Sequence, residues 1–282
     1  MSTISAAAVN ELRKKTDLPM MDCKKALTEA NGDMEKAVTI LRSQFAKATV
    51  KREGNETAEG RIGIAIDNAA QQAAIVEFRC ESAPTVKNDR VIELVADLAK
   101  TVATANPADV PALLATPFGA ATVKERIDEV VGVIREKMVV HKFARDTGHV
   151  YGQYIHHDGS VGTLLVCKGE KATDEVMRDV SAHIAALNPQ FALATEVPAD
   201  LIAKEKELAM SHILAEPKNA GKPANIVEKI AEGKMKTWLA ETVLTEQPMA
   251  NAAKYPNATV GQALAKVGLS VVKFIRFKVG AI

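Results

Sequence analysis

Apolar residues recur at helical spacing in the first part of the chain. The pattern predicts three short helices, at residues 4–16, about 20–30 and 34 to about 45. In the second of these, a buried stripe at i, i+3, i+4 and i+7 is formed by Cys23, Ala26, Leu27 and Ala30. Met20 lies three residues before Cys23 and is expected to lean on this stripe. Met21 falls on the opposite face and is expected to be exposed among lysines.

The period of the pattern changes to two after residue 60. A β-hairpin is predicted by the alternation of Ile62, Ile64 and Ile66 and then of Val76, Phe78 and Cys80. A helix with one apolar stripe follows from about Asn88. The same order returns roughly ninety residues later, with strands at "HVYGQYI" and "VGTLLVC" and a helix marked by Val176, Val180 and Ile184. We therefore predict an α+β fold with a duplicated core of antiparallel sheets and packed helices.

The remaining pattern is helical except at its end. One segment lies between the two units, at about 123–134, and two more open at Pro198 and Pro223 around the polar turn "PKNAGK". A short turn between two amphipathic helices predicts an antiparallel helical hairpin. A final strand is predicted at "SVVKFIRFKVG". We divide the chain into a three-helix module at 1–46, a linker at 47–60, core subdomains at 61–145 and at 146–187 with 240–282, and a hairpin inserted at 188–239.

Composition and charge exclude several classes of protein. The 282 residues carry 36 basic and 35 acidic side chains, and a net charge of +1 argues against a dedicated nucleic-acid or membrane-surface protein. No long apolar run suggests a membrane span, and the first residues read as a helix and not as a secretion signal. Three cysteines without a CxxC pair fit reduced thiols. We expect a cytoplasmic protein.

The chain shows no convincing catalytic, cofactor-binding or metal-binding group. His156, His157 and Asp158 lie in a predicted turn without a second set of ligands, which favours a solvated loop over a metal site. Cys80 and Cys167 end matching strands, and neither has an obvious histidine or basic partner, so buried structural thiols are favoured. There is no GxxxxGK[ST] or strand-linked GxGxxG motif for a nucleotide. An interaction protein is favoured over an enzyme.

Several long runs resemble one family. "LRKKTDLPMMDCKKALTEANGDMEKA" is similar to the N-terminal motif of bacterial elongation factor Ts, and "GHVYGQYIHHDGSVGTLLV", "IVEKIAEGKMKTWLAETVLTEQPM", "TVGQAL" and "FIRFKVG" follow in the order of that family. The resemblance implies an N-terminal module like ubiquitin-associated domains. It also implies the function: binding of elongation factor Tu, a GTPase, and release of its GDP and magnesium so that GTP can rebind.

The resemblance implies contacts with elongation factor Tu at three places. Positions matching the family's N-terminal contacts are Leu12, Arg13, Met20 and Met21. Those matching the wedge region of the first core unit and its neighbouring segment are Ser82, Ala83, Pro84, Thr85, Val86 and Ile134. His156 matches a turn histidine that faces the third domain of the GTPase. A flexible, polarizable methionine such as Met21 suits a docking surface.

Two departures affect these expectations. Where the family has Thr-Asp-Phe, this chain has Ser82, Ala83 and Pro84, and proline cannot fill the pocket of the family's phenylalanine wedge. Burying a phenylalanine is worth roughly 1.5–3 kcal/mol, and a factor of ten in rate is about 1.4 kcal/mol. Loss of the wedge is therefore expected to cost on the order of ten- to a hundredfold in exchange. In addition, Arg135 replaces a glycine and Lys137 an asparagine.

Other interpretations remain open at this point. A relative that binds the GTPase without efficient exchange would carry a change such as Ala83-Pro84, and an adaptor would use only the N-terminal module and leave the core unexplained. The hairpin is a plausible element for a homodimer, although its Ala-rich faces could equally pack on the chain's own core. Longer family members continue into a C-terminal helix that embraces the partner, so that contact is expected to be missing after Ile282.

Overall fold

The computed structural model describes residues 4–16, 18–171, 174–219 and 222–281. Its N-terminal module consists of α1 (Ala6–Thr16), α2 (Met20–Glu29) and α3 (Met34–Lys51). The expected apolar stripe of α2 is buried against Leu12 and Leu41 of the neighbouring helices. Asp33 caps α3 by accepting hydrogen bonds from the backbone N–H groups of Glu35 and Lys36, each at 3.0 Å.

The third helix is longer than its sequence pattern indicates. It continues to Lys51, beyond the expected end near Phe45, and the following strand already begins at Glu59. The extra turns are held from outside the module, because Thr49 Oγ1 donates a hydrogen bond to Asp128 Oδ1 at 2.7 Å. The connection between helix and strand therefore consists of residues 52–58 and is shorter than the expected linker at 47–60. The division of the chain into domains stays a prediction.

The first core unit is a three-stranded antiparallel sheet with helices on one face. Its strands have the order β1 (Glu59–Asp67), β2 (Gln72–Cys80) and β5 (Met138–Thr147). The hairpin β1–β2 was expected, whereas β5 was not. Between β2 and β5 the chain forms α4 (Ala83–Val86), α5 (Asp89–Ala105), α6 (Val110–Ala115), the two-residue strands β3 (Pro117–Phe118) and β4 (Ala121–Thr122), and α7 (Val123–Ile134). The predicted helix at 123–134 is confirmed.

The second unit repeats this plan. Its sheet has the order β6 (Val150–Ile155), β7 (Val161–Lys168) and β8 (Ser270–Lys278), all antiparallel. Helix α8 (Asp174–Leu187) covers this sheet, with α11 (Val260–Ala265) beside it. The α+β class and the duplicated antiparallel core are thus confirmed. The resemblance of the N-terminal module to ubiquitin-associated domains stays a prediction.

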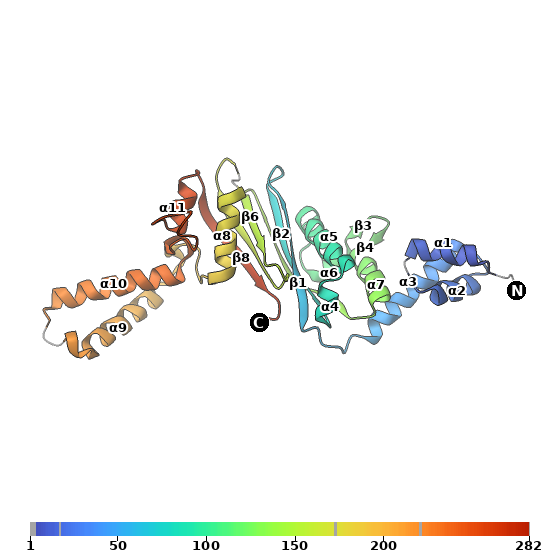
Figure 1. Cartoon of the computed structure of the whole chain (residues 1–282), viewed down its shortest axis with the longest axis horizontal. Coiled ribbons are helices and arrows are strands. Elements are labelled where there is room, and N and C mark those ends of the chain that lie inside the picture. The colour runs from blue at the N-terminus through green and yellow to red at the C-terminus, as the bar shows by residue number, and fades with distance from the viewer. Residues whose placement is uncertain (1–3, 17, 172–173, 220–221, 282) are drawn as a thin grey trace.

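The two sheets pack face to face. Their inner faces share an apolar cluster that contains Ile62, Ile75, Tyr151, Leu164 and Val166. Each outer face is covered by the helices of its own unit. Figure 1 shows the resulting layers, with α8 outside one sheet and α5 outside the other, the N-terminal module at one end of the molecule and α9–α10 at the opposite end.

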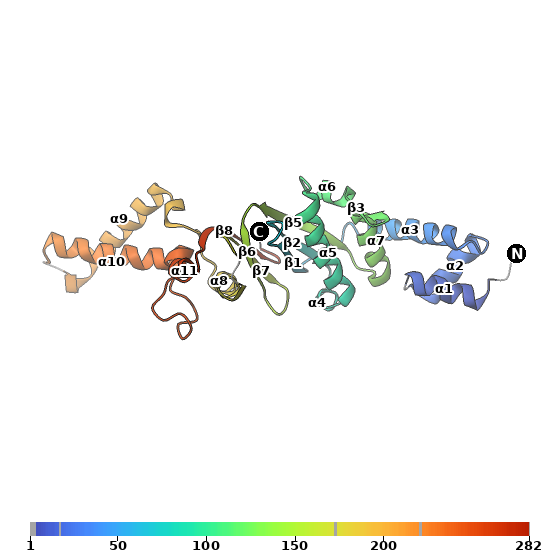
Figure 2. The same ribbon diagram turned by 90° about the horizontal axis from the view of Figure 1, so that it is seen from above.

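The expected helical hairpin projects from the second unit, as the view from above also shows (Figure 2). It comprises α9 (Ala199–Ala215), the 3₁₀ turn η2 (Pro217–Asn219) and α10 (Ala224–Thr242), and 3₁₀ turns η1 (Ala194–Glu196) and η3 (Leu244–Glu246) flank it. Residues 220 and 221 of the predicted turn lie outside the described residues, as does 282.

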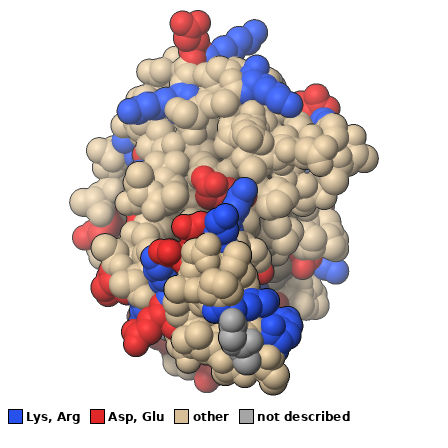
Figure 3. Space-filling model, turned by 90° about the vertical axis from the view of Figure 1, so that its left-hand side faces the viewer, with Lys and Arg blue, Asp and Glu red and all other residues tan. Residues whose placement is uncertain are grey.

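The surface of the hairpin end carries charges of both signs. Blue and red side chains are interspersed there without a patch of one sign (Figure 3). The hairpin also exposes the apolar residues Ile202, Leu208, Leu214 and Ile226. A homodimer through this element stays a prediction. Among the described helices, none is long and apolar enough to cross a membrane.

Candidate protein-binding surface

The first group of predicted contact residues lies on α1 and α2. Met20 is 49% and Met21 60% exposed, and Arg13 is also exposed. The exposure of Met21 was expected, but that of Met20, expected against the buried stripe, was not. Leu12 is 0% exposed and packs in the core of the module. Leu12 is thus buried in the chain without a partner, and its contact with elongation factor Tu stays a prediction.

Met21 has an apolar setting in spite of its exposure. A shallow depression of about 370 Å³ is lined by Met21, Lys24, Lys25, Thr28 and Glu29 on one face of α2. The stems of the lysines supply apolar surface while their charges stay in water. The arrangement suits contact with a partner surface that carries both apolar and acidic groups.

The second group of predicted contacts follows the end of β2. Ser82 stands at the N-terminus of the one-turn helix α4, Ala83 and Pro84 are exposed, and Thr85 and Val86 are buried. Proline is well placed in this first turn because it has no N–H group to satisfy. Of the four helical residues, Ala83 and Pro84 are thus exposed, and the partner contacts expected of Thr85 and Val86 stay predictions.

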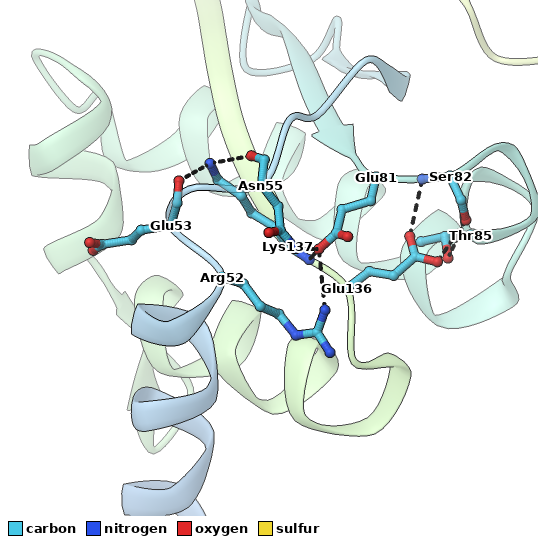
Figure 4. Close-up of polar contacts among 8 residues, drawn as sticks. All are labelled: Arg52, Glu53, Asn55, Glu81, Ser82, Thr85, Glu136 and Lys137. Carbon is cyan, nitrogen blue, oxygen red and sulfur yellow. Dashed lines mark hydrogen bonds and ion pairs between the residues drawn. The ribbon is translucent and has the colours of Figure 1, made fainter.

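The segment between α7 and β5 holds α4 in place. Glu136 accepts two hydrogen bonds from Ser82, from Oγ at 2.6 Å and from the backbone N–H at 3.1 Å. Figure 4 shows Glu136 reaching from this segment to Ser82, with Thr85 beside it. Ser82 Oγ also lies 3.4 Å from Thr85 Oγ1. The exposed residues Ala83 and Pro84 are therefore presented on a fixed turn.

A second polar cluster lies beside the first and joins three connections of the chain. Glu81 accepts hydrogen bonds from the backbone N–H of Lys137 and from Asn55 Nδ2, and it lies 3.4 Å from Arg52 Nη1. These interactions hold the pKa of Glu81 below its usual range, the backbone hydrogen bond from Lys137 contributing most. Lys137 Nζ in turn donates to the carbonyl oxygens of Glu53 and Asn55 (Figure 4).

Ile134 and Arg135 lie at the end of α7. Ile134 is half-buried and packs against the core of the first unit. Arg135 follows with a φ of 66°, and its Nη2 lies 2.9 Å from Asp22 Oδ2 on α2. The position that aligns with a glycine of the family thus keeps the left-handed backbone that glycine favours, yet carries a side chain that reaches the N-terminal module.

The third predicted contact, His156, begins the turn between β6 and β7. Its ring is half-buried, lies 3.2 Å from Tyr154 Oη through Nδ1, and packs edge-on against His157 at 4.3 Å between centroids. Asp158 stabilises the turn by accepting hydrogen bonds from the N–H and Oγ of Ser160, both at 2.8 Å. In this turn the imidazole edge of His156 is held in a defined direction.

Arg61 connects the second and third contact regions. Its Nη1 donates a hydrogen bond to the carbonyl oxygen of Val86 at 3.1 Å. Its side chain also packs on Gly159, where an added Cβ would lie 3.1 Å from Arg61 Cγ. The backbone N–H of Ile62 donates to the carbonyl oxygen of Gly159 at 2.9 Å. The structure thus brings together two segments that the sequence pattern treats as belonging to separate units.

The N-terminal module is docked on the first unit. The ring of Phe45 packs directly on Gly132, where a Cβ would lie 2.1 Å from Phe45 Cδ1. Arg42 Nε lies 3.8 Å from Glu129 Oε1, next to this contact. Because α3 packs along α7, the exposed methionines of α2 stand in a defined position relative to α4.

Cys80 and Cys167 are buried in the cores of the first and second unit. Burial raises the pKa of Cys80 to about 11 and that of Cys167 to about 12, so both thiols stay protonated near neutral pH. Buried structural thiols were the favoured interpretation. Within the described residues, no three His, Cys, Asp or Glu side chains are grouped to hold a metal ion.

Sequence reasoning missed Arg61 and the pair Arg135–Asp22. The sequence pointed to Glu136, because this residue matched the family's segment. Nothing in the sequence indicated that Glu136 binds Ser82. Arg61 lies in β1 next to the alternating isoleucines, and no sequence pattern marks it. Its contacts with Val86 and Gly159 depend on the packing of the two units.

Comparisons with known proteins show the family to which the chain belongs. A sequence profile described as "Elongation factor TS" matches residues 85–281. Elongation factor Ts of Thiobacillus denitrificans is 42% identical, over 99% of this chain and 93% of its own length. That of Nautilia profundicola is 40% identical, over 99% and 94%, and that of Lactiplantibacillus plantarum 39%, over 99% and 93%. The class of protein is therefore a translation elongation factor. Within that class, the chain belongs to the elongation factor Ts family.

Proposed function

We propose that this chain promotes guanine-nucleotide exchange on elongation factor Tu in the cytoplasm, by binding and without a chemical step of its own. The observation that carries the proposal is the presentation of exposed contact residues from one connected scaffold. Met20 and Met21 project from a docked module, and Ala83 and Pro84 from a turn fixed by Glu136. Similarity over nearly the whole chain to elongation factors Ts supports the choice of partner.

The proposed mechanism is thermodynamic linkage. A factor that binds the nucleotide-free GTPase more tightly than the loaded form weakens GDP and magnesium by the same factor. The N-terminal module would hold the nucleotide-binding domain, and the turn at Ala83 and Pro84 would disturb the region around the magnesium ion. The turn at His156 would hold another domain of the GTPase. Binding at several surfaces restrains the partner's geometry and so changes its affinity for nucleotide.

Arg61 gives this mechanism a physical connection. It bonds to Val86 behind α4 and packs on Gly159 in the turn of His156, so the two segments move together. A GTPase that contacts both segments would therefore have two of its domains held at one separation. Such a restraint favours one arrangement of the partner's domains over others.

The test is the release of a fluorescent GDP analogue from elongation factor Tu of the same organism. We expect the unmodified chain to accelerate release. Pro84→Phe restores the side chain that the family uses and is expected to raise the rate by up to about ten- to a hundredfold. Pro256→Phe is the matched control, because it adds an exposed phenylalanine in a different loop, and it is expected to leave the rate unchanged.

A second candidate function is favoured by Pro84 itself. Without the wedge, the chain would bind the GTPase and sequester it. Tight binding with little acceleration, whether or not Pro84→Phe restores it, would refute exchange and support sequestration.

A further inference from the structure

Arg135 has a backbone conformation that is unusual for its residue type. Six residues other than glycine have a positive φ in the part of the chain that the structure describes. They are Asn31, Gln71, Asn106, Arg135, Asn188 and Asn257. Asparagine tolerates the left-handed region because its short polar side chain can bond locally, whereas arginine has no such compensation. A strained backbone conformation of this kind persists where contacts with the surrounding structure hold the residue in place.

The side chain of Arg135 spans from the core to the N-terminal module. Its Nη2 lies 2.9 Å from Asp22 Oδ2, although the two residues are 113 positions apart in the sequence. Asp22 directly follows Met21 on α2, so the ion pair attaches the helix that carries the exposed methionines. Among the described residues, Phe45 on Gly132 and Thr49 to Asp128 attach the module through α3, and Val133 of α7 packs against the core of the module.

The residues next to Arg135 hold the second contact region. Glu136 binds Ser82 through two hydrogen bonds, and the backbone N–H of Lys137 donates to Glu81. Three consecutive residues therefore attach α2 on one side and the turn that presents Ala83 and Pro84 on the other. No other segment among the described residues is shown to bond to both regions.

We propose that Arg135 is a positioning residue that sets the direction in which α2 presents Met20 and Met21 relative to Ala83 and Pro84. Contacts along α3 hold the module on α7, and Val133 of α7 packs against the core of the module. The ion pair to Asp22 adds an attachment on a second helix, the one that carries Met20 and Met21. The proposal rests on the proposed function in so far as one GTPase must meet both surfaces at once.

The direct test measures the orientation of the module in the full-length chain without a partner. Spin labels are placed on Thr28→Cys in α2 and Lys100→Cys in α5, both exposed, while the three native cysteines are buried. Arg135→Gly is expected to broaden the distribution of distances between the labels without lowering stability, because glycine relieves the backbone strain. Lys15→Ala is the matched control, since it removes an exposed ion pair within α1, to Glu11.

Rescue separates positioning from a general effect of substitution. Arg135→Asp alone is expected to broaden the distribution, and combination with Asp22→Arg restores the ion pair with exchanged charges and should narrow it again. An unchanged distribution in Arg135→Gly, or no narrowing in the exchanged pair, would overturn the proposal.

Measurements of GDP release and of binding to the GTPase then separate the proposed exchange function from the positioning role of Arg135. If the unmodified chain accelerates release, Arg135→Gly is expected to weaken binding to the GTPase by about two- to fivefold, as loss of an exposed ion pair allows. If Arg135→Gly bound the GTPase as tightly as the unmodified chain, only the positioning role would be overturned. No acceleration by the unmodified chain would overturn the proposed exchange function, and the functional part of this inference with it.

Discussion

Gly132 allows the N-terminal module to dock closely, and its replacement by alanine tests this role. An added Cβ would lie 2.1 Å from Phe45 Cδ1 and 2.5 Å from Cε1, far inside van der Waals contact. The ring of Phe45 would have to move, and overpacking of this kind costs about 1–3 kcal/mol. Alanine also favours the helix over glycine by up to about 1 kcal/mol. The net expectation for Gly132→Ala is a loss of about 1 kcal/mol in the free energy of unfolding.

Gly233 provides a matched control on another helix. It lies within α10, and nothing lies within 4 Å of where its Cβ would be. Gly233→Ala is therefore expected to gain about 0.5–1 kcal/mol from helix propensity alone. The two substitutions have the same chemistry and should shift stability in opposite directions.

Urea unfolding and hydrogen exchange together can measure both effects. Trp238 is the one tryptophan of the chain and lies in α10, so its fluorescence reports on the hairpin and its response to Gly233→Ala. Exchange of the α3 amides reports on docking and should become faster in Gly132→Ala. Adding Phe45→Leu, which makes room for the new methyl group, is expected to recover part of the loss. If Gly132→Ala stabilised the chain as much as Gly233→Ala, close docking on Gly132 would be the wrong explanation.

Three further predictions follow from single side chains. Burial lowers the pKa of His183 below its usual value of 6.5, so protonation favours the unfolded chain. The free energy of unfolding should therefore fall as the pH drops below 6.5. His183→Gln should make the free energy of unfolding, measured with urea at pH 7.5 and 5.5, less dependent on pH. Met21→Ala should weaken binding to elongation factor Tu by up to about tenfold without a change in stability. Val267→Ala, at another exposed apolar residue, should change neither binding nor stability. Arg61→Met should speed hydrogen exchange in both segments that Arg61 joins, and equal protection would refute that connection.

The sequence pattern predicted the elements whose periodicity is regular. The stripe of α2 and the helix α7 followed from spacing, and the hairpin α9–α10 followed from spacing and from the prolines at the starts of its two helices. β5 was missed, because "MVVHKFARDT" interrupts its alternation with charged residues. Pairing with β2 makes this segment a strand, and a bulge between Glu77 and Phe78 adjusts the register. Such pairing depends on residues far away in the sequence.

The candidate site could be predicted only in part, for the same reason. Exposure of Met21 followed from its position opposite an apolar stripe, and burial of Leu12 would have followed from its spacing with Val9. The roles of Arg61 and Arg135 could not be predicted, because each depends on a contact between units. The sequence marked Arg135 only as a departure from glycine.

The strand β8 has a consequence for how the chain is made on the ribosome. β7 ends at Lys168 and β8 begins at Ser270, with the whole hairpin between them. At roughly 5–20 residues per second, synthesis of the intervening segment takes roughly 5–20 s. For that time the second sheet lacks an edge strand, and Val272, Ile275 and Phe277 are missing from the cluster between the sheets. The nascent chain therefore passes through a stage in which β7 is an unpaired edge and part of the apolar cluster is uncovered, and such surfaces favour aggregation until β8 is added.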